Sequence, residues 1–157
     1  MISSPLLSSK WEHLALWSRR GNLPVMTGDH SAPPEVAEIE AIARAALKTL
    51  PKELNRHAAQ VVVKVEEFAD AETEREMKLD SPFDLLGLYR GVSLDQKSVA
   101  DTPYDIDMIF LYRRPILDYW CESGEDLAHI VRHVLMHEIG HHLGLSDGDM
   151  RRIEERA

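Results

Sequence analysis

The sequence contains a single cysteine, Cys121, among 157 residues. One thiol cannot form a disulfide within the chain, and such scarcity is typical of proteins from reducing compartments. No local motif places a histidine or asparagine beside this thiol as a catalytic partner. We therefore expect Cys121 to be a buried or half-buried bystander and the protein to be cytoplasmic.

Positive charge and long apolar runs are also scarce. The 18 lysines and arginines are outnumbered by 27 aspartates and glutamates, and the formal net charge of -9 argues against a nucleic-acid partner. No apolar run approaches the length of a membrane-spanning helix, and the amino terminus lacks the charged start and continuous apolar core of a signal peptide. We therefore expect no membrane partner.

The chain is long enough, and at 44% hydrophobic residues apolar enough, to form one domain with its own core. Residues 1–30 differ from the rest, because serines and a proline surround a short stripe with Trp11 and Trp17. We interpret them as an N-terminal extension that is flexible or forms a short helix, which docks loosely or anchors a partner. Residues 31–157 are expected to form the domain.

Apolar periodicity and turn residues predict both helices and strands in that domain. A first helix begins near Pro33 and Pro34, which suit a first turn, and ends at Pro51. The other expected elements are strands at 61–65, 85–91 and 106–112, one or two helical turns at 116–121, a long helix at about 125–143, and a short helix ending at Ile153. Because Asp107 falls within the third strand, we expect that strand to lie at a sheet edge or to have one face in water.

The long helix carries two histidines four residues apart, His137 and His141, with Glu138 directly after the first. Positions four apart share one face of a helix, so both imidazoles can bind one cation. Two nitrogen ligands with an adjacent carboxylate base are typical of zinc hydrolases. A broad apolar arc on the same helix predicts deep burial. The alternative is a core helix whose histidines only form hydrogen bonds.

The candidate acids for a third ligand that follow the helix are Asp147, Asp149, Glu154 and Glu155. We favour Asp147, since it lies ten residues after His137 and Gly144 permits the positive φ that a returning chain requires. The alternative is that Asp147 only caps the last helix.

Three further histidines and three tyrosines lie near the motif or in the strands. His129 and His133 are expected at the surface or in support of the ligands, and His142 in the core. Candidates for stabilising a developing oxyanion beside the zinc are Tyr89, Tyr104 and Tyr112.

These residues together predict amide hydrolysis by attack of metal-bound water. Zinc lowers the pKa of its water ligand to about 7 and polarises the carbonyl of the substrate. Glu138 would accept the water proton and pass it to the leaving group.

The pattern H-E-x-x-H-x-x-G-x-x-D at 137–147 resembles that of the minimal zincins, a family of short bacterial zincin-like metallopeptidases. The segments 86–91 and 109–116 look like other recurring parts of that family, and the likeness covers about 34–150. It implies an α+β fold with a small mixed sheet of three to four strands, helices packed on it, and a C-terminal active-site helix. It also implies Zn²⁺ held by His137, His141 and Asp147, with Glu138 as the base.

The resemblance has two departures from full metzincins. The lower half-domain and the methionine turn are missing, and Met150 stands too close to Asp147 to supply that turn. Three hypotheses follow: a zinc peptidase acting on a short peptide or unfolded protein aligned along strand 106–112, a non-catalytic metal-binding scaffold or partner-binding module, and a hydrolase of a non-peptide amide or ester.

Overall fold

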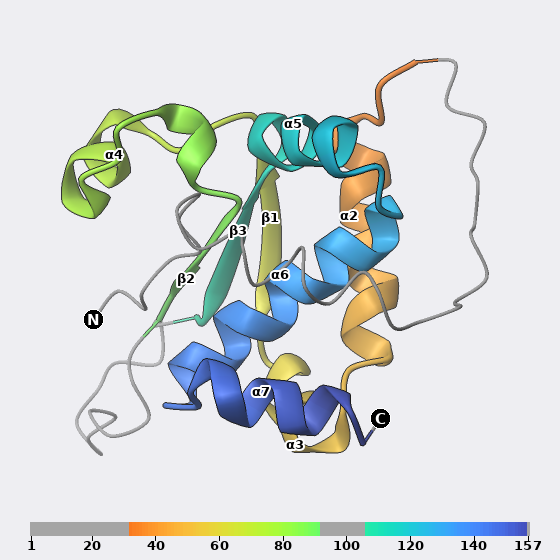
Figure 1. The fold of residues 1–157 in the computed structure, drawn as a ribbon. Coiled ribbons are helices and arrows are strands. Elements are labelled where there is room, and N and C mark those ends of the chain that lie inside the picture. Colours follow the sequence, from red (N-terminus) through yellow and green to blue (C-terminus); the bar gives the residue numbers. More distant parts are fainter. Residues whose placement is uncertain (1–31, 92–105, 157) are drawn as a thin grey trace.

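The computed structural model describes residues 32–91 and 106–156 and has an α+β architecture with a three-stranded mixed sheet (Figure 1). The strands are β1 (Val62–Glu66), β2 (Gly87–Arg90) and β3 (Met108–Tyr112), in the spatial order β1-β3-β2. Strand β3 runs parallel to β1 and antiparallel to β2. The predicted fold class, with its small mixed sheet, is therefore confirmed.

The prediction of an edge strand at 106–112 is wrong, because β3 is the central strand of the sheet. Asp107 misled the prediction, since it immediately precedes β3 and does not lie within it. Inside the strand, Ile109 and Leu111 are fully buried, as a central strand requires. Among the strands that the structure describes, β1 and β2 lie at the edges of the sheet.

Helices cover one face of the sheet with the main core. Helix α2 (Val36–Lys48) and helix α6 (Leu127–His142) pack against each other and against β1 and β2, respectively. Helix α3 (Lys52–Ala58) follows Pro51, which serves as its N-cap. Pro33 and Pro34 precede the N-cap of α2, Glu35, so they lie before the first turn and not in it as predicted.

The other face of the sheet carries a smaller apolar cluster that includes Leu88 and Tyr112. It is covered in part by the segment that contains helix α4 (Ala71–Met77) and the short 3-10 helix η2 (Pro82–Asp84). Because side chains alternate between faces along a strand, Leu111 meets the main core while Phe110 and Tyr112 meet this cluster.

Helix α5 (Arg113–Ser123) starts directly after β3 and is longer than the one or two turns predicted at 116–121. Pro115 lies in its first turn, where a missing backbone N–H costs no helical hydrogen bond. The helix buries Ile116 and Tyr119 and turns Cys121 toward solvent. The expectation that Cys121 is buried or half-buried is therefore wrong.

The chain ends with helix α7 (Asp147–Glu154), which turns back beneath α6 (Figure 1). Among the described residues, no helix is both long enough and apolar enough to cross a membrane. The predictions for residues 1–30 and for Tyr104 lie outside the described ranges.

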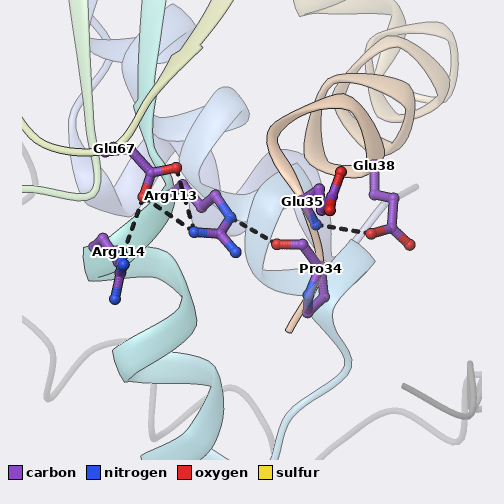
Figure 2. A network of polar contacts seen from close by, with 6 residues as sticks. All are labelled: Pro34, Glu35, Glu38, Glu67, Arg113 and Arg114. Atoms are coloured by element: carbon purple, nitrogen blue, oxygen red, sulfur yellow. Dashed lines mark hydrogen bonds and ion pairs between the residues drawn. The ribbon is translucent and has the colours of Figure 1, made fainter. Parts of the chain in front are cut away.

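Arg113, the first residue of α5, joins three parts of the fold (Figure 2). Its Nε donates to the buried backbone oxygen of Pro34 at 2.7 Å, and its Nη1 donates to Glu67 Oε2 at 3.0 Å. Arg114 also donates to Glu67, at 3.0 Å. Desolvation of Glu67 acts in the opposite direction, but the two arginines hold the pKa of that carboxyl below its ordinary value.

We expect Arg113→Met to destabilise the protein by about 1–3 kcal/mol, because a buried carbonyl loses its donor. Arg114→Met is the matched control: its side chain is 59% exposed, against 13% for Arg113, and an exposed ion pair contributes at most about 1 kcal/mol. Urea unfolding monitored by circular dichroism measures the free energy of unfolding of both variants. Equal losses in the two variants would contradict this account.

Candidate metal centre

Helix α6 runs through the core and carries most of the predicted site. Its N-cap is Asp126, whose carboxylate accepts a hydrogen bond from His129 N at 3.1 Å. The helix is buried over most of its surface, with no exposed area on Ile130, Val134 or Ile139. Sequence periodicity predicted this deep burial of the helix correctly. The burial holds the two motif histidines on a rigid element.

The structure brings His137, His141 and Asp147 together. One potential ligand atom from each lies within 4.8 Å of the other two. Asp147 Oδ1 lies 3.3 Å from His141 Nε2 and 3.9 Å from His137 Nδ1. The carboxylate therefore faces both imidazoles of the predicted pair.

The connection between α6 and α7 explains how Asp147 reaches the histidines. Gly144 has a φ of +78°, and its N–H donates to the carbonyl of His141 at 3.0 Å. This left-handed residue reverses the chain at little steric cost, as the motif predicted.

The side chain of Asp147 is not used as a helix cap. The N-cap of α7 is Ser146, whose Oγ accepts from Asp149 N at 3.2 Å while Asp149 Oδ2 accepts from Ser146 N at 3.0 Å. This capping box provides hydrogen-bond partners for backbone N–H groups at the start of α7. It engages the carboxylate of Asp149, which also accepts a hydrogen bond from Arg152. Asp147 is thus left to face the histidines, and the alternative that it only caps α7 is wrong.

The donor set fits a zinc ion. Two imidazoles and one carboxylate are a known ligand set of catalytic zinc, which binds neutral imidazole nitrogen. Burial lowers the pKa of His137 to about 3, with a further contribution from His133, so its ring is neutral at physiological pH. Within the described part of the chain, His137 Nδ1 is buried without a hydrogen-bond partner. A buried nitrogen of this kind costs free energy unless something binds it.

Glu138 is fully buried beside the histidine pair, and its Oε2 accepts a hydrogen bond from the backbone N–H of Tyr89 at 2.9 Å. Tyr112 N donates to Leu86 O at 2.9 Å, so the alternation of an antiparallel ladder turns the N–H of Tyr89 away from β3. The outer edge of β2 therefore faces the predicted base. Sequence reasoning missed this contact, because it joins residues 49 positions apart.

The described tyrosines occupy different surroundings. The ring of Tyr89 stacks on His142, with centroids 3.9 Å apart, and its hydroxyl bonds Asp107. Burial, with Asp107 next, raises the pKa of Tyr89. Tyr112 belongs to the apolar cluster on the other face of the sheet. His142 is half-buried, short of the core position expected for it, and lies outside the group of three side chains that can share an ion.

His133 is buried, with 6% of its surface exposed, so of the two positions expected for it, at the surface or in support of the ligands, the first is wrong. Its ring packs on that of His137 with centroids 4.1 Å apart, and its Nδ1 lies 3.5 Å from Glu154 Oε1. The spacing of four from His133 to His137 to His141 is the signal that places all three on one side of α6.

Met150 lies under the site and is fully buried. A Cβ added to Gly140, which stands between the two histidines in sequence, would lie 2.3 Å from Met150 Sδ. Met150 follows Asp147 by three residues, so one turn of α7 is enough to place it against α6. The contact lets α7 approach α6 closely.

A family model described as zincin-like metallopeptidase matches residues 58–157. The match covers more than half of the chain and includes the whole motif, and the chain belongs to the zincin-like metallopeptidase family. No curated protein matches the sequence. The resemblance inferred from the motif is confirmed, and the family indicates a metal-dependent hydrolase.

We expect Gly140→Ala to destabilise the protein by about 1–3 kcal/mol, because the new methyl group displaces Met150. Gly148→Ala is the matched control on α7. The nearest atom to its added Cβ lies 3.7 Å away, and alanine favours a helix by up to about 1 kcal/mol over glycine. Thermal unfolding should move in opposite directions for the two variants, and a stabilised Gly140→Ala would contradict the packing.

Burial, then His129 and Arg132, lowers the pKa of His133 from an ordinary 6.5 to about 3. At a pH between these two values, His133 is protonated in the unfolded chain and neutral in the folded protein. Because the unfolded chain then binds one more proton, the metal-free protein loses stability as pH falls below about 6.5. One such group contributes up to about 1.4 kcal/mol per pH unit. Desolvation of the Glu154 side chain raises the pKa of that carboxyl, which acts in the opposite direction. His133→Asn should therefore flatten the dependence of unfolding free energy on pH, measured in urea, and an unchanged slope would contradict it.

Proposed function

We propose that the protein is a zinc-dependent metallopeptidase, with His137, His141 and Asp147 as metal ligands and Glu138 as general base. The observation that carries the proposal is the meeting of the three donor side chains within 4.8 Å of one another, beside a buried glutamate. Membership of the zincin-like metallopeptidase family supports the same chemistry.

The position of Glu138 supports its proposed role as the base. It follows His137 directly, and the N–H of Tyr89 fixes one of its oxygens. When bound, zinc supplies Lewis-acid activation of water and polarises the substrate carbonyl at neutral pH. Glu138 accepts the proton lost by the attacking water and passes it to the leaving nitrogen. Its burial keeps bulk water from competing for that proton.

We infer that an extended peptide, or an unfolded segment of a protein, lies along β2. Of the two sheet edges, β2 is the one that contacts the base, through Tyr89. An added strand gains main-chain hydrogen bonds that do not depend on its sequence, which suits a peptide substrate. Strand β2 thus takes the place of strand 106–112 as the proposed substrate-binding strand, because 106–112 lies at the centre of the sheet.

We infer a cytoplasmic location from the single cysteine. Cys121 is exposed, and an exposed thiol persists where the surroundings are reducing. The excess of acidic side chains supports a protein that does not bind nucleic acid.

The purified protein should bind about one zinc ion per chain, measured by elemental analysis. Glu138→Gln should keep the metal, since a glutamine oxygen can still accept from Tyr89 N, and should lower peptide hydrolysis by about 10²–10⁴-fold. His137→Ala should lose both metal and hydrolysis.

Glu155→Gln, at an exposed position of the same part of the chain, serves as the control and should behave as the parent. Hydrolysis that survives in Glu138→Gln would exclude Glu138 as the base. One bound zinc without turnover of peptides would favour a metal-binding scaffold, and turnover of esters or non-peptide amides alone would favour the third hypothesis.

A further inference from the structure

Helix α7 presents three side chains to α6, at Asp147, Met150 and Glu154. Spacings of three and four residues place them on one face of a helix. Met150 is the one fully buried residue of α7, and the side chain of Glu154 is only 5% exposed. With so little of its side chain in contact with water, Glu154 depends for its position on the groups that it contacts within the protein.

The partners of this face lie in a row along α6. Asp147 faces His137 and His141, and Met150 packs on the helix at Gly140. Glu154 Oε1 lies 3.5 Å from Nδ1 of His133, whose side chain is 6% exposed. The two helices thus run antiparallel, with an acid of α7 against an imidazole at each end and a methionine between them.

We propose that Glu154 is a positioning residue for the third metal ligand: through its contact with His133 it holds α7 against α6 and keeps Asp147 at the histidine pair. The inference rests on the proposed metal site and goes beyond it, since Glu154 is assigned no contact with the metal. Among the described residues, His137, His141 and Asp147 form the group of three that can share an ion, and Glu154 is not a member.

The need for such an anchor follows from the size of α7. A helix of eight residues does not persist alone in water, so α7 is helical because it is docked. Its apolar contact with α6 depends on Met150. When the competent arrangement is populated only in part, the apparent dissociation constant of a ligand rises in inverse proportion to that population. Loosening the Glu154 end therefore weakens metal binding even though every ligand remains.

The test is a double-mutant cycle on the full chain, with zinc affinity measured by competition against a chromophoric chelator. Glu154→Ala should bind zinc about 10-fold more weakly than the parent, the scale seen when groups that support metal ligands are removed. Glu155→Ala, an exposed neighbour, should change the affinity less than about 2-fold.

The second arm of the cycle uses Asp147→Asn, which removes the carboxylate that Glu154 is proposed to position. If Glu154 acts through Asp147, Glu154→Ala should cause no further loss of zinc affinity in that background. A merely structural role would lower the affinity, or the melting temperature, by the same factor in both backgrounds, and that result would overturn the proposal. An unchanged affinity in Glu154→Ala alone would overturn it as well.

Cobalt as the probe separates positioning from ligation. At saturation the visible spectrum of Co²⁺ in Glu154→Ala should match that of the parent, since the ligand set is the same, and a changed spectrum would make Glu154 a ligand and overturn the proposal. If Glu154→Ala does not fold, Glu154→Gln, which keeps the side-chain volume, replaces it in the cycle. A parent protein that binds neither metal would refute the proposed function itself, a result distinct from all of these.

Discussion

The approach of the Asp147 carboxylate to the imidazoles of His137 and His141 is the contact on which the site depends. The histidines lie on a helix fixed by the core, whereas Asp147 lies on a short helix that follows a reversal of the chain. The reversal requires the left-handed Gly144 and a cap supplied by Ser146, so that the Asp147 side chain is left over. The backbone conformation between α6 and α7 thus determines whether a third donor side chain, Asp147, joins the two histidines.

Polar burial is concentrated around this contact. Within the described ranges, the polar residues that are buried as whole residues, backbone included, are Thr73, His133, His137 and Glu138. Three of these four lie within six residues on α6. Buried polar groups cost stability unless they are satisfied, so a core built for stability alone would place apolar side chains there. The clustering of these buried polar residues beside the motif indicates that they are present for function and not for stability.

The parts of the site that could be predicted from sequence are those joined by short chain segments. A helical spacing of four relates His137 to His141, and a single turn at Gly144 relates them to Asp147. The contact of Tyr89 with Glu138 could not be predicted, because it depends on which strand lies at the sheet edge beside α6. Strand order is set by packing between distant segments, and Asp107, the residue just before β3, was a misleading guide to it.

The same reasoning explains why β2 is the edge that borders the site. Strand β3 leads directly into α5, and α6 then returns across the sheet to pack on β2. At Gly87 an added Cβ would lie 2.6 Å from Val134 of α6, so the missing side chain there permits close approach of helix and strand. That approach lets the backbone N–H of Tyr89, two residues along, reach a carboxylate on the helix. The glycine in β2 therefore contributes to the site through distance alone, by setting how near the sheet edge comes to the base.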